Sequence, residues 1–301
     1  MIRLGLCCKF AAADIKFPVT TALSAGRLKP AARRVKLAAL CRANAAALEQ
    51  ALNYCAANGI GSFRVNSQIL PLKTHPALGY ELPDLPGGRE IIKSFKACGA
   101  LARRLGLRLT FHPDQFILLS SENPKITESA VGELNYQAEV AEWIGADVIN
   151  IHGGGAYGDK AAALARVAKA INELKPAVRS RLVLENDDRV YTPADLLPFC
   201  REHRVPFVYD AHHHRCLPDG LGVEKVTELA LATWGREPLF HLSSPREGWH
   251  GPDTRSHHDY IDLKDFPAPW RGLDVTIEVE AKAKELAIAR LRAQLAGKGW
   301  I

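Results

Sequence analysis

The stretch Val183-Leu184-Glu185-Asn186-Asp187-Asp188 decides the fold. The apolar residues of 181–184 lead directly into the carboxylate of Glu185, which is typical of a buried parallel strand with a polar side chain at its C-terminal end. Seven other stretches have a similar form, and several of them also end in a residue type that binds metal ions. The stretch therefore predicts a strand that delivers a carboxylate to a metal site.

Strand-like and helix-like segments alternate along the whole chain. The eight strand-like segments are 3–7, 62–65, 107–111, 147–151, 181–184, 206–209, 238–242 and 274–280. Helical patterns follow most of them, at 31–58, 90–105, 127–144, 160–174, from 192 onward, at 222–234 and at 281–296. This alternation predicts an α/β fold, a single-domain (β/α)8 TIM-type barrel over residues 1–301. An open doubly wound sheet is the alternative, but no GxGxxG sequence follows the first strand.

The composition is that of a globular protein, with 47% hydrophobic and 24% charged residues. No apolar run approaches the roughly 20 residues of a membrane span, and the stretch 1–10 lacks the apolar region of a signal peptide. The seven scattered cysteines form no CxxC pair, so we expect reduced thiols in a cytoplasm. A formal net charge of +6 is compatible with a polyanionic partner but does not establish one.

Ligand-type residues stand at the ends of six consecutive predicted strands, the third to the eighth. In an α/β barrel these ends share one rim, where function is located. A lone histidine there is more often an ordinary polar residue than a ligand, but six such ends in succession predict a metal site. The stretches 210–214 and 257–259 add further candidates. The strand-end residues are His112, His152, Glu185, Asp210, His241, and Glu278 or Glu280.

The number of candidate ligands exceeds what one ion needs, because four side chains satisfy one Zn²⁺ ion. We therefore expect two or three divalent ions, some of them bridged by Glu185 or Asp210. Ions ~3.5–4 Å apart suit phosphoryl chemistry, although a divalent-metal sugar isomerase on the same fold is an alternative. No P-loop or GxSxG motif is present, which disfavours nucleophilic catalysis by serine.

Nine strings, in order and over nearly the whole chain, resemble the UV damage endonuclease family. They are RLGLCC, FRVNSQILPLKTHP, FHPDQF, NIHGGGAYGDK, LVLENDD, YDAHHH, FHLSSPRE, HHDYID and EAKAKE. The resemblance implies a TIM-type barrel related to endonuclease IV, with Mn²⁺ as the first choice of metal and Zn²⁺, Mg²⁺ or Co²⁺ as alternatives. It also implies damaged double-stranded DNA as the partner, with no obligate protein partner. The implied reaction is a nick immediately 5′ to cyclobutane dimers or 6-4 products, with some activity at abasic sites.

The same resemblance assigns roles to individual residues. Glu185 becomes a catalytic, bridging carboxylate. Gln115 and Phe116 resemble a pair that inserts into the duplex where the lesion is flipped out, because an amide and an aromatic ring can stack on the remaining bases. The alternative for Phe116 is packing on the barrel rim. The implied metal ligands are His112, His152, Glu185, Asp210, His213, His241, His257 and Glu280, with His258 and Glu278 as substitutes for the last two.

DNA contacts are expected from residues outside the ligand set. Asn66, at the end of the second strand, is expected to contact the DNA. The long Pro- and Gly-rich loop that follows it holds Lys73, expected at a phosphate, and His75, expected in a catalytic role at the scissile phosphate. Each basic residue could equally be a solvated surface charge. The further basic residues expected at phosphates are Arg189, Arg246 and Arg255.

The chain also departs from the family. Some members have a lysine, thought to be carboxylated, two residues before the seventh-strand histidine, where this chain has Leu239. Some have a first-strand tyrosine that contacts the lesion, where this chain has Leu6 and Cys7. We therefore expect metal-site electrostatics and a lesion spectrum that differ from those relatives. The leading hypothesis is hydrolysis by metal-activated water to a 3′-hydroxyl and a 5′-phosphate; a non-catalytic binder of damaged DNA is a further alternative.

Overall fold

Eight parallel strands form a closed barrel in the computed structural model, which describes residues 1–114 and 116–301. Because β1 pairs with both β2 and β8, the sheet has no edge strand. The predicted (β/α)8 barrel is confirmed, and every predicted strand end lies within one residue of the observed end. The strands are β1 (Ile2–Cys7), β2 (Ser62–Val65), β3 (Arg108–Phe111), β4 (Val148–His152), β5 (Leu182–Glu185), β6 (Phe207–Asp210), β7 (Leu239–Leu242) and β8 (Val275–Val279).

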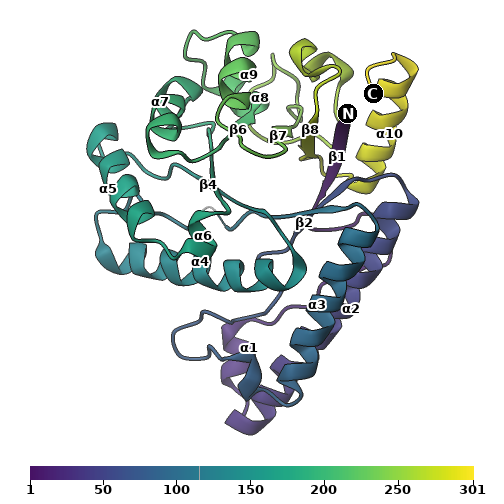
Figure 1. Cartoon of the computed structure of the whole chain (residues 1–301), viewed down its shortest axis with the longest axis vertical. Coiled ribbons are helices and arrows are strands. Elements are labelled where there is room, and N and C mark those ends of the chain that lie inside the picture. Colours follow the sequence, from purple (N-terminus) through teal and green to yellow (C-terminus); the bar gives the residue numbers. More distant parts are fainter. Residues whose placement is uncertain (115) are drawn as a thin grey trace.

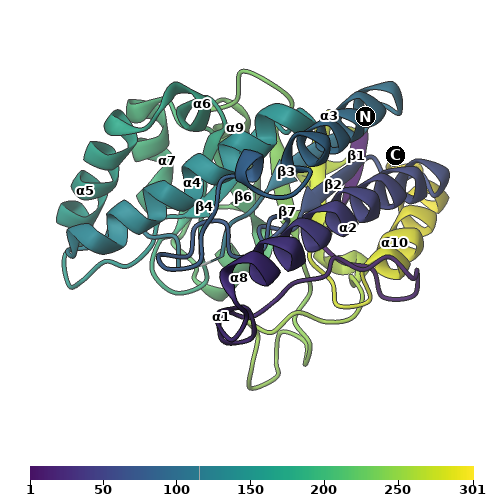
Figure 2. The ribbon, with the colours of Figure 1, turned by 90° about the horizontal axis from the view of Figure 1, so that it is seen from below.

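Helices surround the barrel, and the two chain ends lie beside each other near the last helix (Figures 1 and 2). The longer helices are α2 (Pro30–Ala57), α3 (Gly88–Arg104), α4 (Pro124–Ile144), α5 (Lys160–Glu173), α7 (Pro193–His203), α9 (Val223–Leu231) and α10 (Glu285–Gly297). Shorter elements were not predicted: α1 (Ala22–Gly26), η1 (Leu82–Asp84), α6 (Pro176–Arg179), α8 (Ala211–Cys216), η2 (Leu263–Asp265) and η3 (Ala268–Trp270). Across residues 1–114 and 116–301, none of the helices combines the length and hydropathy needed to cross a bilayer.

Two predicted helix starts are wrong. The helix α4 begins at Pro124 rather than at residue 127, and its N-cap is Asn123, because the Asn123 side chain accepts a hydrogen bond from the backbone N–H of Lys125. The helix α10 begins at Glu285, and residues 281–284 form a turn instead of its first turn of helix. The backbone of Lys284, with a φ of 51°, does not continue a helix.

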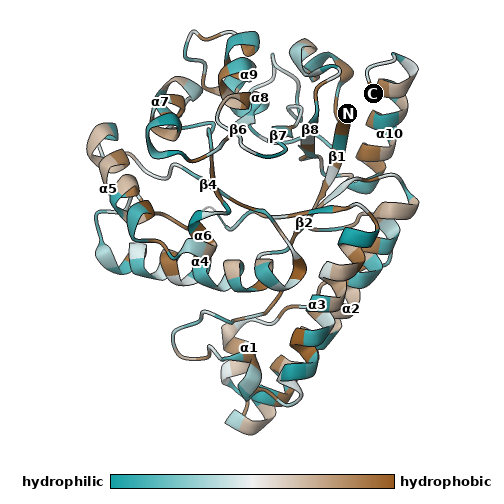
Figure 3. Ribbon diagram, in the orientation of Figure 1, coloured by the Kyte–Doolittle hydropathy of each residue, from teal (hydrophilic) through white to brown (hydrophobic). Residues whose placement is uncertain are grey.

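The barrel interior is layered. Val148, Val183, Val208 and Leu239 form a buried apolar cluster contributed by β4 to β7. Two residues further along each of these strands stand polar or charged side chains, which the period of two places on the same inner face. Apolar residues run along β1 and β4, while the outer helices mix polar and apolar residues (Figure 3). The apolar layer therefore forms a floor under the C-terminal ends of these strands, and Leu239 belongs to that floor.

Candidate metal centre

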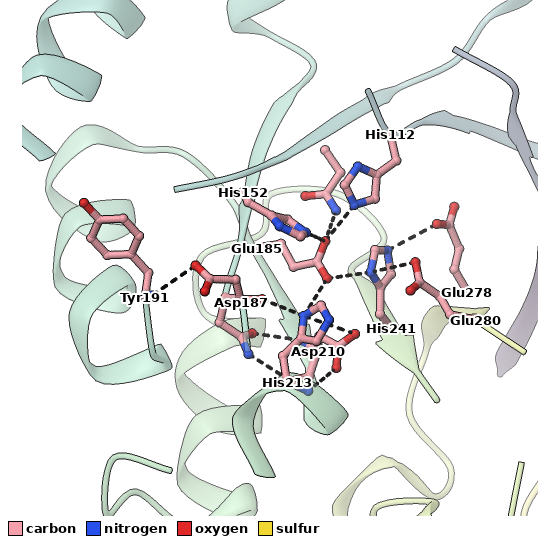
Figure 4. Close-up of polar contacts among 12 residues, drawn as sticks. His112, His152, Glu185, Asp187, Tyr191, Asp210, His213, His241, Glu278 and Glu280 are labelled. Atoms are coloured by element: carbon pink, nitrogen blue, oxygen red, sulfur yellow. Dashed lines mark hydrogen bonds and ion pairs between the residues drawn. The ribbon is translucent and has the colours of Figure 1, made fainter. Parts of the chain in front are cut away.

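Glu185, the last residue of β5, is the fully buried centre of the site. Its Oε2 atom lies 3.0 Å from Nε2 of His112 and 3.2 Å from Nε2 of His152. Its Oε1 atom lies 2.9 Å from Nδ1 of His241 and 3.3 Å from Nδ1 of His213. The four imidazoles come from four different segments, the residue after β3, the last residue of β4, the helix α8 and the strand β7, and converge on one carboxylate (Figure 4).

Parallel pairing explains the convergence. His152 is the register partner of Glu185, and His241 is the partner of both Asp210 and Glu278. Equivalent positions on neighbouring parallel strands lie on the same face of the sheet, so these side chains reach the same rim. The stretch that predicted the fold thus also delivers the central residue of the site.

Asp210 and His213 are fixed by a short helix. Asp210 ends β6 and is the N-cap of α8, since its Oδ1 atom accepts a hydrogen bond from the backbone N–H of His213 at 2.7 Å. Asn186 holds the backbone of Asp210 through both its amide nitrogen and its amide oxygen. The helix places the ligand-type atoms of Asp210 and His213 3.6 Å apart. The three consecutive histidines 212–214 of the candidate stretch 210–214 are therefore helical.

Glu280 and His257 complete the set of eight predicted ligands, which we call the ligand group. Its members are His112, His152, Glu185, Asp210, His213, His241, His257 and Glu280. The Oε1 atom of Glu280 lies 3.6 Å from Nδ1 of His241, and its Oε2 atom lies 3.7 Å from Nδ1 of His257. His258, the substitute for His257, instead accepts a hydrogen bond from the backbone N–H of Tyr260 at 2.9 Å. This arrangement favours His257 over His258 as the residue that faces the ligand group.

The residues present fit divalent ions. Three sets of ligand-type atoms lie within 4.8 Å of one another: His112, His152 and Glu185; His112, His241 and Glu280; and Glu185, Asp210 and His213. Among the described residues, Nε2 of His152 and Oδ2 of Asp210 are buried without a hydrogen-bond partner. Such orphaned atoms are rare in folded proteins. Imidazoles and carboxylates, in sets that share His112 and Glu185, form a donor set suited to clustered Zn²⁺ or Mn²⁺ ions.

Arg64 was not singled out from the sequence. It is buried within β2, where its Nε atom donates to Glu278 at 2.5 Å and its NH1 group donates to Glu280 at 2.6 Å. Its NH2 group lies 2.9 Å from Nε2 of His241. The sequence feature that could have identified Arg64 is a charged residue in the middle of a short buried strand, because a buried charge requires a partner. Asn150, which donates to Glu185 Oε2 at 2.5 Å, was missed in the same way.

The electrostatics of the centre depend on opposite charges in a buried space. Burial raises the pKa of Glu185, but the nearby His241 and His152 lower that pKa by more than burial raises it. The pKa of Glu185 therefore lies well below its usual range. Burial lowers the pKa of His241, yet Glu185 and its other acceptors raise it to about 10. Burial raises the pKa of Glu278, and Arg64 and His241 bring it down to about 2. The carboxylates are therefore held in the ionised form that binds cations.

A model of the family "UV-endonuclease UvdE" matches residues 2–300. The chain belongs to the UV-endonuclease UvdE family. The resemblance inferred from the motifs is confirmed, as is the prediction of a nuclease at the level of the family. Similar proteins include a UV DNA damage endonuclease of Bacillus velezensis, 36% identical over 282 residues, with 89% of this chain and 85% of that protein covered. The corresponding protein of Bacillus pumilus is 36% identical over 267 residues, with 84% and 81% covered.

Solved structures share the fold of this UvdE-family chain. The crystal structure of SacUVDE matches at a TM-score of 0.87, with 24% identity and 100% of both chains covered. Endonuclease IV from Thermus thermophilus matches at 0.61, with 17% identity and 83% and 94% covered. D-Psicose 3-epimerase from Clostridium cellulolyticum H10 matches at 0.57, with 14% identity and 84% and 93% covered. At these identities the likenesses show a common barrel.

The predicted lesion-probing pair of this UvdE-family chain follows β3. Gln115 lies outside the described residues. Phe116 lies four residues after His112, and 72% of its surface is exposed. The alternative that Phe116 packs on the barrel rim is therefore wrong. An exposed aromatic ring so close in sequence to a ligand-type histidine is available to a bound molecule.

Two of the predicted DNA contacts of this UvdE-family chain stand in the loop between β2 and α3. The ammonium of Lys73 lies 2.9 Å from Glu81, its side chain is only 7% exposed, and it lines a cavity shared with Lys175 of the connection before β5. That connection is at the end of the barrel where the strands begin. His75 accepts backbone hydrogen bonds from its own loop. Within the described chain, neither Lys73 nor His75 contacts the ligand group, so their DNA roles stay predictions.

Two other predicted DNA contacts of this UvdE-family chain follow strand ends. Asn66 directly follows β2, and its side chain accepts a hydrogen bond from the backbone N–H of Gln68 at 2.8 Å. Arg246 follows β7, where its backbone N–H donates to Ser256 beside His257. The guanidinium of Arg246 is half-exposed and lies 3.6 Å from Glu247. Both residues are thus on the ligand side of the barrel, where contact with a large substrate remains a prediction.

Proposed function

We propose that the chain nicks damaged double-stranded DNA immediately 5′ to UV photoproducts and leaves a 3′-hydroxyl and a 5′-phosphate. The observation that carries this proposal is the convergence of four imidazoles on the Glu185 carboxylate, in a chain that the UV-endonuclease model matches over residues 2–300. Cyclobutane dimers and 6-4 products are the proposed substrates, with abasic sites as a further one. The seven free cysteines fit action in a reducing cytoplasm.

The ligand group would hold two or three divalent ions, with Mn²⁺ as the first candidate. Such ions supply Lewis acidity, which activates water and neutralises charge on the phosphate. The two oxygens of Glu185 face different pairs of imidazoles, so Glu185 would bridge the ions. Arg64 neutralises Glu278 and Glu280 and so limits the negative charge that faces the DNA. The proposed ligands are His112, His152, Glu185, Asp210, His213, His241, His257 and Glu280.

Recognition of the lesion would depend on how easily the DNA is deformed. A photoproduct weakens stacking and pairing, so flipping it out of the duplex costs less than flipping normal bases. Phe116 is exposed and would stack on the bases left behind, with Gln115 as the proposed second member of the pair. Asn66 and Arg246 would then contact the strand on either side of the ligand group.

The test is a nicking assay on a duplex with one site-specific thymine dimer, in Mn²⁺ or in EDTA. Wild type, Glu185→Ala and the control Glu237→Ala are compared. Glu237 is a half-buried carboxylate paired with Arg3 and Thr276, at the end of the barrel where β1 and β8 begin. We expect one cut 5′ to the dimer in wild type and in the control, with loss of the cut in EDTA and in Glu185→Ala. Extension of the product by a polymerase would identify the 3′-hydroxyl.

A specific outcome would overturn the proposal. If no divalent metal supports a cut while a known lesion endonuclease cuts the same duplex, DNA repair is not the function. The barrel shared with D-psicose 3-epimerase then makes ketohexoses the next substrates to assay. Retention of damage-specific binding in Glu185→Ala, without a cut by wild type, would instead indicate a binder of damaged DNA.

A further inference from the structure

A cavity of about 460 Å³ lies beside the ligand group, between the C-terminal ends of β1, β2 and β8. His257 and Glu280 of the ligand group form part of its wall. The remaining wall includes the lysines Lys9, Lys282 and Lys284. A molecule in this cavity would therefore lie next to the metal centre without occupying it.

The charge of the cavity is positive. Within the described chain, none of the three lysine side chains forms an ion pair, whereas the carboxylates of Glu278 and Glu280 are already paired with Arg64. Lys9 and Lys282 are exposed and Lys284 is half-exposed. Uncompensated ammonium groups around a concave surface attract anions. The cavity thus suits an anionic ligand.

The backbone at Lys284 is held in an unusual conformation. Its φ is 51° and its ψ is −121°, a strained region that L-residues rarely adopt. The conformation persists because the turn is fastened on both sides. The backbone N–H groups of Lys282 and Ala283 donate to the carbonyls of His258 and Asp259, and the Glu285 carboxylate accepts from the backbone N–H groups of 11–13. A glycine would adopt this conformation freely, yet the chain has a lysine there.

We propose that this cavity binds a backbone phosphate of the DNA strand, next to the scissile phosphate, with Lys284 as the fixed cation. Lys9 and Lys282 bind the same or the adjoining phosphate from more mobile positions. The proposal rests on the proposed function, since it names a second contact of the same DNA substrate. Lysine suits this role because a compact ammonium binds phosphate as a point charge.

The experiment measures binding of the dimer-containing duplex by fluorescence anisotropy across a KCl series. EDTA is present to prevent nicking, and kcat/KM is measured separately in Mn²⁺. The variants are Lys284→Gly, Lys284→Arg and the control Arg204→Gly. Arg204 also has a positive φ, 52°, and also carries one positive charge, but it precedes β6 at the opposite end of the barrel. The control therefore removes one charge and one unfavourable φ away from the cavity.

We expect Lys284→Gly to bind the duplex about ten-fold more weakly, with the slope of log K against log[KCl] reduced by about 0.9, as for one lost phosphate contact. Its KM should rise more than its kcat falls, and its melting temperature should not fall, because glycine relieves the backbone. Lys284→Arg should keep the slope of wild type. Arg204→Gly should keep both the affinity and the slope.

Equal slopes for Lys284→Gly and Arg204→Gly would overturn the proposal. A lower melting temperature for Lys284→Gly would overturn the claim that the lysine is held at a cost. Lys9→Gln, on a different element, provides an independent measurement with the same expected loss of slope. Failure of the proposed function gives a different result, since nicking would then be absent in every protein while the binding slopes still test the cavity.

Discussion

Glu278 and Arg64 form a buried pair directly behind one of the proposed ligands. Nε2 of His241 lies 3.2 Å from Glu278 Oε2, while its Nδ1 atom faces Glu185. A metal-binding imidazole usually donates its other N–H to a carboxylate, which fixes the ring and strengthens the ligand. Arg64 and Thr110 both donate to Glu278 and hold that carboxylate in place.

The exchange Glu278→Gln should therefore weaken Mn²⁺ binding about 10–100-fold, the range found when such supporting groups are lost. Calorimetric titration of the metal-free protein measures the dissociation constant. Glu237→Gln is the matched control, because Glu237 is also held by an arginine and a threonine but lies away from the ligands. The effect should vanish in a His241→Ala background; if it persists there, Glu278 does not act through His241.

Phe116 offers a second prediction for a single side chain. Because the ring is largely exposed, Phe116→Ala should leave the melting temperature unchanged. Loss of base stacking should weaken binding to the dimer duplex by about 1–3 kcal/mol. Phe116→Trp should restore most of that binding. A comparable loss on single-stranded DNA without a lesion would show that the ring does not probe the duplex.

The ligand residues could be predicted from sequence, whereas their supporting residues could not. A histidine or carboxylate at the end of an apolar run is visible in the chain itself, as for His112 and Glu185. Arg64 and Asn150 contribute to the site by binding side chains on other strands. Those partners are far away in the sequence, so no local pattern identifies them. The register that sets Glu278 beside His241 follows from barrel closure, which no local pattern reports.

At the scale of elements, helix ends determine how the site is built. The short α8 was not predicted because three histidines carry little helix propensity. Asp210 overrides that weakness by capping the helix while it also offers its other oxygen to the ligand group. The start of α10 was misplaced because the pattern 281–296 continues without a visible break. The break comes from contacts with distant loops, which propensity does not include.

The N-terminus of α10 anchors the loop after β1, and this gives a pH-dependent prediction. Burial raises the pKa of Glu285, but hydrogen bonds from the backbone N–H groups of 11–13 outweigh it and lower the pKa. A carboxylate with a lowered folded-state pKa stabilises the fold above its unfolded pKa, and this contribution is lost as the pH falls through the folded value. The loop position therefore depends on an ionised Glu285.

Glu285→Gln should lower the free energy of unfolding at pH 7 by about 1–3 kcal/mol, as for charged hydrogen bonds. Urea denaturation of the metal-free protein at a series of pH values measures it. The difference from wild type should shrink below about pH 4, where the wild-type carboxyl group also becomes neutral. Glu128→Gln, on the exposed side of α4, is a control for the loss of one charge. A difference that stays constant with pH would contradict this account.

At the scale of the whole molecule, the residues that stabilise the fold and the residues of the proposed metal centre occupy different parts of the barrel. The apolar floor and the outer helices were predictable from periodicity, since they follow the rules of burial. The ligand end concentrates four carboxylates, Glu185, Asp210, Glu278 and Glu280, against one arginine. Like charges in a buried space oppose folding unless cations compensate them. Bound ions should therefore stabilise the fold of the entire barrel, in addition to supporting its activity.

The last prediction follows from this linkage. In the metal-free protein His241 has a pKa raised to about 10, so its protonated form stabilises the fold below its unfolded value of about 6.5, and that contribution is lost as the pH rises through about 10. A metal ion must displace the Nδ1 proton, so ions and protons compete. The rise in melting temperature caused by Mn²⁺ should therefore grow from pH 6 to pH 8, as scanning calorimetry would measure. In Glu185→Ala the rise should be small at every pH; a rise that does not vary with pH in wild type would mean that His241 is not a ligand.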